Sequence, residues 1–109
     1  MTAERVASAI GRRGRSLTLR RYTGTARKFF DVTVKGVVSN YRPEQLAGGI
    51  QQGDRQIIIA NTEIAARQWP GPPRRSDAIK IDGIFVTIEN VETVYAGEDI
   101  AKHVLQVRG

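Results

Sequence analysis

The sequence predicts a mainly β fold: a small antiparallel β-barrel or sandwich of about six strands, with an N-terminal helix and two long loops. Short runs rich in β-branched residues recur along the chain, separated by glycine, proline and aspartate turns. One such turn, Asp82-Gly83, supplies the positive φ that a two-residue hairpin loop needs. A chain of 109 residues can bury one modest core, so we expect a single domain spanning residues 1–109.

The first part of the chain predicts a helix followed by two strands. Residues 2–12 are expected to be helical because their apolar side chains recur at i, i+4, and Gly11 and Gly14 mark the end of the helix. Residues 16–22 and 30–39 alternate apolar and polar side chains, as half-buried strands do. Gly36 lies inside the second of these runs and predicts a bulge or a sharp coil there.

Two irregular segments flank a third strand in the middle of the chain. Residues 40–53 form the first long loop, and residues 54–64 regain strand character through three consecutive isoleucines. Residues 67–76 form the second loop, where three prolines within four positions exclude a helix and a central strand. Asp54 and Asp77 each follow a turn and open a strand, so their carboxylates are expected to bond the local backbone.

The C-terminal part predicts a three-stranded antiparallel meander. Residues 77–95 form a hairpin, and imperfect alternation at residues 89–91 predicts a bulge or bend in its second strand. Residues 103–108 are expected to return alongside that strand. The side chains expected to be mostly buried are those of Leu17, Leu19, Val32, Val34, Ile57, Ile59, Ile81, Val86, Ile88 and Leu105.

Positive charge is concentrated at the start of the chain. The formal net charge is +6, with +8 in residues 1–42 and −2 in residues 43–109. Such an asymmetry either presents a basic face to a polyanion or leaves solvated and ion-paired arginines, and both readings stay open. The candidate DNA or subunit contacts are Arg12, Arg13, Arg15, Arg20 and Arg21. Because Arg20 and Arg21 are neighbours in a strand, they should face opposite sides, and at most one can line a channel.

The two loops supply the other candidate contacts. The candidate partner-contact residues there are Tyr41, Arg42, Trp69, Arg74 and Arg75. Trp69 lies among prolines, which favours a rigid binding hot spot. The alternative is that its side chain folds back and plugs one end of the barrel.

No pattern for catalysis or cofactor binding is present in the sequence. The chain has no cysteine and one histidine, His103, which cannot build a typical zinc site and is expected to be structural or exposed. Phosphate-binding and dinucleotide-binding glycine patterns are absent. No apolar run reaches the ~20 residues that cross a bilayer. We therefore expect a soluble, intracellular protein that is not an enzyme, needs no cofactor or metal and does not enter a membrane.

The chain resembles the neck proteins of tailed bacteriophages, known as head-tail joining, head-completion or stopper proteins. In residues 10–21, the end of a helix is followed by a Thr-Leu-Arg-Arg strand, as in that family. In residues 53–60, a Gly-Asp turn leads into an apolar strand, which is a second feature of the family's pattern. Ser76-Asp77 stands where the family more often has Gly-Asp. The motifs that follow are Ile81-Asp82-Gly83, a valine-rich strand, Val94-Tyr95-Ala96-Gly97 and Leu105-Gln106-Val107-Arg108.

The resemblance implies a β-barrel that assembles as a homo-oligomeric ring between the portal complex and the tail. Such a ring closes the filled head, contacts packaged DNA without sequence specificity, and docks portal or adaptor proteins on one side and tail proteins on the other. The implied location is the virion neck, and the implied place of assembly is the cytoplasm of the bacterial host. The encoding genome would be that of a phage or of a prophage. Arg12, Arg13 and Arg15 would then form a shared basic rim.

The competing hypothesis is a stand-alone nucleic-acid-binding barrel, OB-like or SH3-like. Against it, Tyr22, Phe29, Phe30 and Tyr41 do not predict an obvious base-stacking platform on adjacent strands. Salt-dependent affinity for free single strands would favour this hypothesis, and concentration-dependent ring formation would favour the neck protein.

Overall fold

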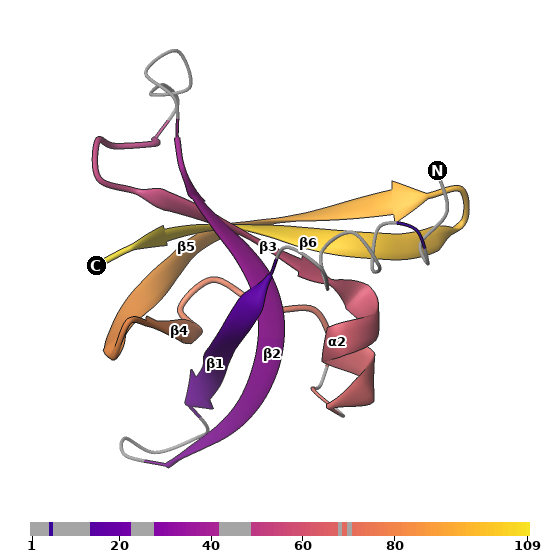
Figure 1. Cartoon of the computed structure of the whole chain (residues 1–109), viewed down its shortest axis with the longest axis horizontal. Coiled ribbons are helices and arrows are strands. Elements are labelled where there is room, and N and C mark those ends of the chain that lie inside the picture. The colour runs from indigo at the N-terminus through magenta and orange to yellow at the C-terminus, as the bar shows by residue number, and fades with distance from the viewer. Residues whose placement is uncertain (1–4, 6–13, 23–27, 42–48, 68, 70) are drawn as a thin grey trace.

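The computed structural model describes residues 5, 14–22, 28–41, 49–67, 69 and 71–109. Within them, six antiparallel strands form a closed barrel in the order β1-β2-β3-β6-β5-β4 (Figure 1). The mainly β fold and the barrel are thus confirmed, whereas the helix expected at residues 2–12 lies, except for residue 5, outside the described residues. The elements are β1 (Arg15–Tyr22), β2 (Phe29–Asn40), β3 (Arg55–Ala60), α2 (Asn61–Ala66), β4 (Ala78–Ile81), β5 (Ile84–Ala96) and β6 (Asp99–Arg108).

The β4–β5 hairpin forms at the turn that the sequence predicts. Asp82 and Gly83 have φ angles of 51° and 83°, and Ile81 pairs with Ile84 across the turn. The predicted irregularity of β5 is also present, because the register with β6 shifts between Ile88 and Asn90. This long strand pairs with β4 through its first four residues and with β6 through the rest, which closes the barrel.

Gly36 permits close packing; of the bulge or sharp coil that the sequence predicted there, the bulge is not formed. It pairs in register with Arg15 of β1 on one side and Ile59 of β3 on the other. A Cβ atom at this position would lie 3.0 Å from Leu17 Cδ1 and 3.2 Å from side-chain carbons of Ile57 and Ile59. The missing side chain therefore lets three core residues meet over the β2 backbone.

The third strand is shorter than predicted because a helix follows it. Residues 54–64 were expected to be strand, but β3 ends at Ala60 and α2 runs from Asn61 to Ala66. Glu63 and the two alanines after Ile64 are good helix formers, and Ile64 buries its side chain in the core. The Glu63 carboxylate also accepts a 2.8 Å hydrogen bond from the backbone N–H of Lys35 in β2, which ties the helix to the barrel wall.

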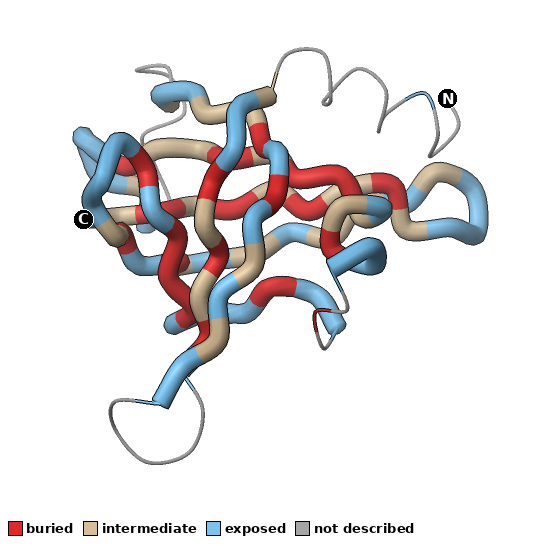
Figure 2. The backbone as a smooth tube through the Cα atoms, turned by 60° about the horizontal axis from the view of Figure 1, so that its bottom comes forward, coloured by how far each residue is buried: buried red, intermediate tan, exposed pale blue. Residues whose placement is uncertain are grey.

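The core fills the barrel interior, and the buried residues recur along the strands, as the red segments of the tube show (Figure 2). Nine of the ten predicted core residues are buried, and Val32 is half-buried and packs against the cluster. Val107, Ile79 and Trp69 complete the core. Each fully buried side chain of this size contributes roughly 1.5–3 kcal/mol.

Past the barrel, the ends of β5 and β6 continue as a hairpin that, among the described residues, pairs only with itself. β3 stops pairing with β6 at Lys102, opposite Ala60, and β4 stops pairing with β5 at Thr87. We call residues 95–101 the arm; in Figure 1 it is the yellow hairpin that reaches beyond the other strands.

Candidate interaction surfaces

Three aromatic and two basic side chains, exposed or half-buried, lie together on the outer side of β1, β2, β4 and β5. We call this surface the aromatic-basic face: Arg20, Tyr22, Phe29, Lys80 and Phe85. Tyr22 and Phe29 are direct partners across β1 and β2, and their rings meet edge to face at 6.4 Å. Lys80 and Phe85 are direct partners across β4 and β5.

Arg20 holds the two halves of this face together. Its guanidinium carbon lies 3.7 Å from the Phe29 ring centroid and 4.0 Å from that of Phe85. Its Nε and Nη2 donate to the two carboxylate oxygens of Asp31 at 2.8 and 2.9 Å. These bonds raise the pKa of Arg20 above its ordinary value. The result is a fixed cation packed against two rings on the barrel surface.

This arrangement corrects part of the argument against a nucleic-acid-binding barrel. Tyr22 and Phe29 do lie side by side on adjacent strands, contrary to the sequence interpretation. Phe30 instead packs against the core, with its ring tilted against that of Trp69 at a centroid distance of 4.9 Å. Phe85, which the sequence analysis did not single out, reaches the surface only because β4 and β5 close the barrel beside β1.

Arg21 and Trp69 belong to the interior, so neither is available as a surface contact in this structure. Arg21 is 4% exposed and donates to both carboxylate oxygens of Asp77, at 3.0 and 2.8 Å, and to the Pro72 carbonyl at 3.1 Å. Its guanidinium carbon lies 4.7 Å from the ring centroid of Trp69, which is 5% exposed. Of the two interpretations of Trp69, the structure supports the plug. Arg20 and Arg21 do face opposite sides, as predicted.

Asp54 and Asp77 anchor two equivalent turns. Each carboxylate accepts a hydrogen bond from the backbone N–H three residues earlier, that of Gln51 at 2.9 Å and that of Arg74 at 2.8 Å. The residues before them, Gly53 and Ser76, have φ angles of 96° and 80°. The prediction that both carboxylates bond the local backbone is therefore confirmed. In addition, each binds an arginine through two nitrogens.

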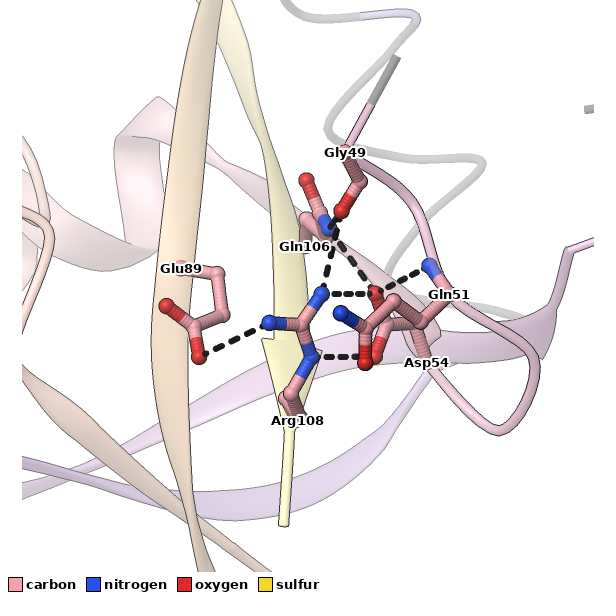
Figure 3. A network of polar contacts seen from close by, with 6 residues as sticks. All are labelled: Gly49, Gln51, Asp54, Glu89, Gln106 and Arg108. Carbon is pink, nitrogen blue, oxygen red and sulfur yellow. Dashed lines mark hydrogen bonds and ion pairs between the residues drawn. The ribbon is translucent and has the colours of Figure 1, made fainter. Parts of the chain in front are cut away.

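The Asp54 turn ties the described part of the first long loop to the end of β6 (Figure 3). Arg108 Nε and Nη2 each donate to Asp54 at 2.9 Å, and Nη2 also donates to the Gly49 carbonyl at 3.0 Å. Gln106 Nε2 donates to Asp54 at 2.9 Å, and Arg108 Nη1 lies 3.5 Å from Glu89. The bonds from Arg108 hold the pKa of Asp54 well below its usual range.

Tyr41 lines a hollow of about 460 Å³ on the outer side of β3, β6 and β5. Polar and apolar side chains share its wall, among them Gln56, Glu92, Lys102 and Val104. Burial raises the pKa of the Tyr41 phenol. The hollow holds no arrangement of groups that defines a reaction, so Tyr41 remains a candidate contact residue.

The other predicted contact residues lie at separate places. Arg15 is exposed and pairs with Asp82 across 3.0 Å, and Arg74 and Arg75 are exposed in the second loop. Arg12, Arg13 and Arg42 lie outside the described residues.

The arm carries a second exposed surface. Tyr95 is 62% exposed near its end, beside exposed Glu98 and Asp99. Gly97, at φ 66°, makes the turn between the two strands. Among the residues that the structure describes, neither Glu98 nor Asp99 forms an ion pair with another side chain. We call Tyr95, Glu98 and Asp99 the arm tip.

His103 is a core residue held by two polar neighbours. Its Nε2 lies 3.0 Å from Asn61 Oδ1 in α2, and its Nδ1 lies 3.1 Å from Thr93 Oγ1 in β5. The ring is fully buried, and this burial lowers the pKa of His103 below 6.5. Both nitrogens have partners, so the histidine is structural, which is one of the two readings expected from the sequence.

The described residues contain no cluster of three or more His, Cys, Asp or Glu side chains that could hold a metal ion. No helix in the described ranges is long and apolar enough to cross a membrane. No protein-family model matches this chain, and no curated protein matches it at a significant level.

Proposed function

We propose that this protein is a non-enzymatic ring subunit of the neck of a tailed bacteriophage. In that role it lies between the portal complex and the tail, closes the filled head and joins the tail. Its partners are further copies of itself, portal or adaptor proteins, tail proteins, and packaged DNA contacted without sequence preference.

The observation that carries the proposal is the presence of two different exposed surfaces on one small barrel. The aromatic-basic face lies on β1, β2, β4 and β5, whereas the arm tip lies at the far end of β5 and β6. In Figure 1 the ends of β1 and β2 that carry Tyr22 and Phe29 point down, and the arm points to the side. Two unlike surfaces on one chain favour head-to-tail contacts, which close into a ring when the rotation permits.

The sequence resemblance supports the same role. Its landmarks coincide with features that define this barrel: the two aspartate turns at Asp54 and Asp77 and the hairpin turn at Asp82-Gly83. These positions specify a fold rather than a reaction. A structural role in an assembly therefore fits the motifs better than catalysis does.

Complementation tests the proposal. A tailed phage from which the gene for this protein has been deleted should regain filled heads with joined tails when the wild-type chain is supplied in trans. Changing Arg12, Arg13 and Arg15 together to Gln tests the basic rim, because the positive charges of the rim would contribute to DNA retention. Normal titres from the triple variant would refute the rim and leave the neck role standing. Normal titres without the gene would refute the neck role.

A second candidate is the stand-alone nucleic-acid-binding barrel, which the aromatic-basic face favours. Tyr22, Phe29 and Phe85 stand among basic residues, as stacking side chains do in single-strand binding proteins. This function predicts submicromolar binding of a labelled oligonucleotide that weakens steeply with salt and is lost in Phe29→Ala. No binding at low salt would exclude it.

A further inference from the structure

We infer that the arm tip of one subunit docks on the aromatic-basic face of the next copy of this chain. The inference rests on the proposed ring, and it names the two surfaces that form the contact between neighbouring subunits.

The side chains of the aromatic-basic face are held in place in the isolated subunit, before any partner binds. Arg20 is fixed between the Phe29 and Phe85 rings and held by both oxygens of Asp31. Tyr22, 55% exposed, and Phe29, 47% exposed, leave large apolar areas open beside it. Tyrosine and arginine are enriched at the energetic centres of protein interfaces, and side chains already held in place lose little entropy on binding.

The arm tip has the complementary chemistry. Tyr95 offers an aromatic ring, and Glu98 and Asp99 offer carboxylates that no side chain in the described residues neutralises. On the face, Lys80 is exposed and makes no ion pair within the described part of the chain; its Nζ lies 5.7 Å from the Phe85 ring centroid. Acidic groups meeting basic groups, with aromatic rings between them, favour association and fix its register.

The arm tip and the aromatic-basic face of one subunit lie too far apart on the barrel to contact each other, so the contact is with a neighbouring subunit. The arm extends beyond the last residues of β3 and β4 that pair with β6 and β5. The face lies on the opposite part of the barrel wall, around β1, and both views show the arm separated from the lower ends of β1 and β2. A tip on one subunit and a face on the next make a heterologous contact, which is the kind that a ring needs.

The same details make protein a better occupant of this face than nucleic acid. The Arg20 guanidinium already covers one side of the Phe29 ring and one side of the Phe85 ring, where bases would stack.

Disulfide trapping tests the contact, because the natural chain has no cysteine and only introduced thiols can react. Ala96→Cys places a thiol next to the tip, and Thr87→Cys places one next to Arg20 on the face, in the row Arg20, Ala78, Thr87. Neither change removes a proposed contact residue. The two full-length variants, one carrying a size tag, are mixed at high concentration and oxidised. The matched control replaces Thr87→Cys by Thr62→Cys, an exposed position on α2.

The expected result is several-fold more mixed dimer from the tip-face pair than from the control pair, with the yield falling as salt is added. Glu98→Lys with Asp99→Lys in the Ala96→Cys chain should reduce the yield to the control level, and Lys80→Glu in the partner should restore part of it. Equal yields from both pairs, or a yield that the charge reversals leave unchanged, would overturn the inference. Trapping without phage complementation would support the contact between arm tip and face and refute the neck role. Complementation without trapping would support the neck role and refute the contact.

Discussion

Removing the charge of Asp77 should be the most damaging polar substitution in the barrel. Asp77→Asn keeps the size of the side chain and can keep the hydrogen bond from the Arg74 N–H. It leaves the Arg21 guanidinium, whose side chain is 5% exposed, without its counter-charge. A guanidinium group keeps its charge inside proteins, so the positive charge stays buried in the variant.

The magnitude follows from the burial of this ion pair. Breaking a buried pair by removing one partner costs roughly 3–5 kcal/mol. We expect about 3 kcal/mol here, because the Trp69 ring and the Pro72 carbonyl continue to stabilise the cation. The matched control is Arg15→Gln, which breaks an ion pair whose side chains are 47% and 72% exposed and should cost under ~1 kcal/mol.

Urea denaturation followed by tryptophan fluorescence measures both variants, since Trp69 is the only tryptophan and lies in the affected cluster. The double variant Arg21→Met, Asp77→Asn should lose less stability than Asp77→Asn alone, because no buried charge is left unpaired. If Asp77→Asn cost no more than the Arg15→Gln control, at unchanged urea dependence, the buried-pair reasoning would be refuted.

Three further predictions concern stability. Ile88→Ala should cost about 2–5 kcal/mol in a denaturant titration because Ile88 is fully buried, and a loss under ~1 kcal/mol would mean that the core is misplaced. Ser76→Gly should add about 0.5–1 kcal/mol because Ser76 is held at φ 80°, whereas Ser76→Ala should add nothing. Burial lowers the folded pKa of His103, so the unfolded chain binds more protons below pH 6.5 and stability falls as the pH decreases from there. The stability advantage of the wild type over His103→Gln, measured by urea unfolding at pH 7.5 and 5.5, should therefore shrink at the lower pH; an advantage that stays constant would contradict this.

Local signals in the sequence were sufficient for most of the barrel. The Asp82-Gly83 turn, the two aspartate turns and the alternation around Leu17 and Leu19 each depend on residues close in sequence. These local signals were therefore enough to predict most of the strands and nine of the ten expected core residues. The prediction that the third strand continues to Ile64 was wrong, because the residues after Ala60 combine good helix formers with one apolar side chain that packs in the core.

The interaction surfaces could not be predicted in the same way. Phe85 meets Arg20 only because β4 closes the barrel against β1, and no pattern within either segment indicates that pairing. The burial of Arg21 likewise depends on Asp77, 56 positions later. Arg20 and Arg21 are adjacent and identical in the sequence. The alternation of the strand predicts only that they face opposite sides, not which of them is buried.

The most direct test of the central claim is an electron-microscopy image, in negative stain, of the purified protein mixed with the purified portal complex of a phage that encodes it. The account predicts an added ring on the tail-facing side of the portal. In the Glu98→Lys, Asp99→Lys variant, that ring should be absent or incomplete, because its subunits lack the contact between arm tip and face. Portal particles without added density, at protein concentrations high enough to saturate a micromolar site, would contradict the assignment to the neck.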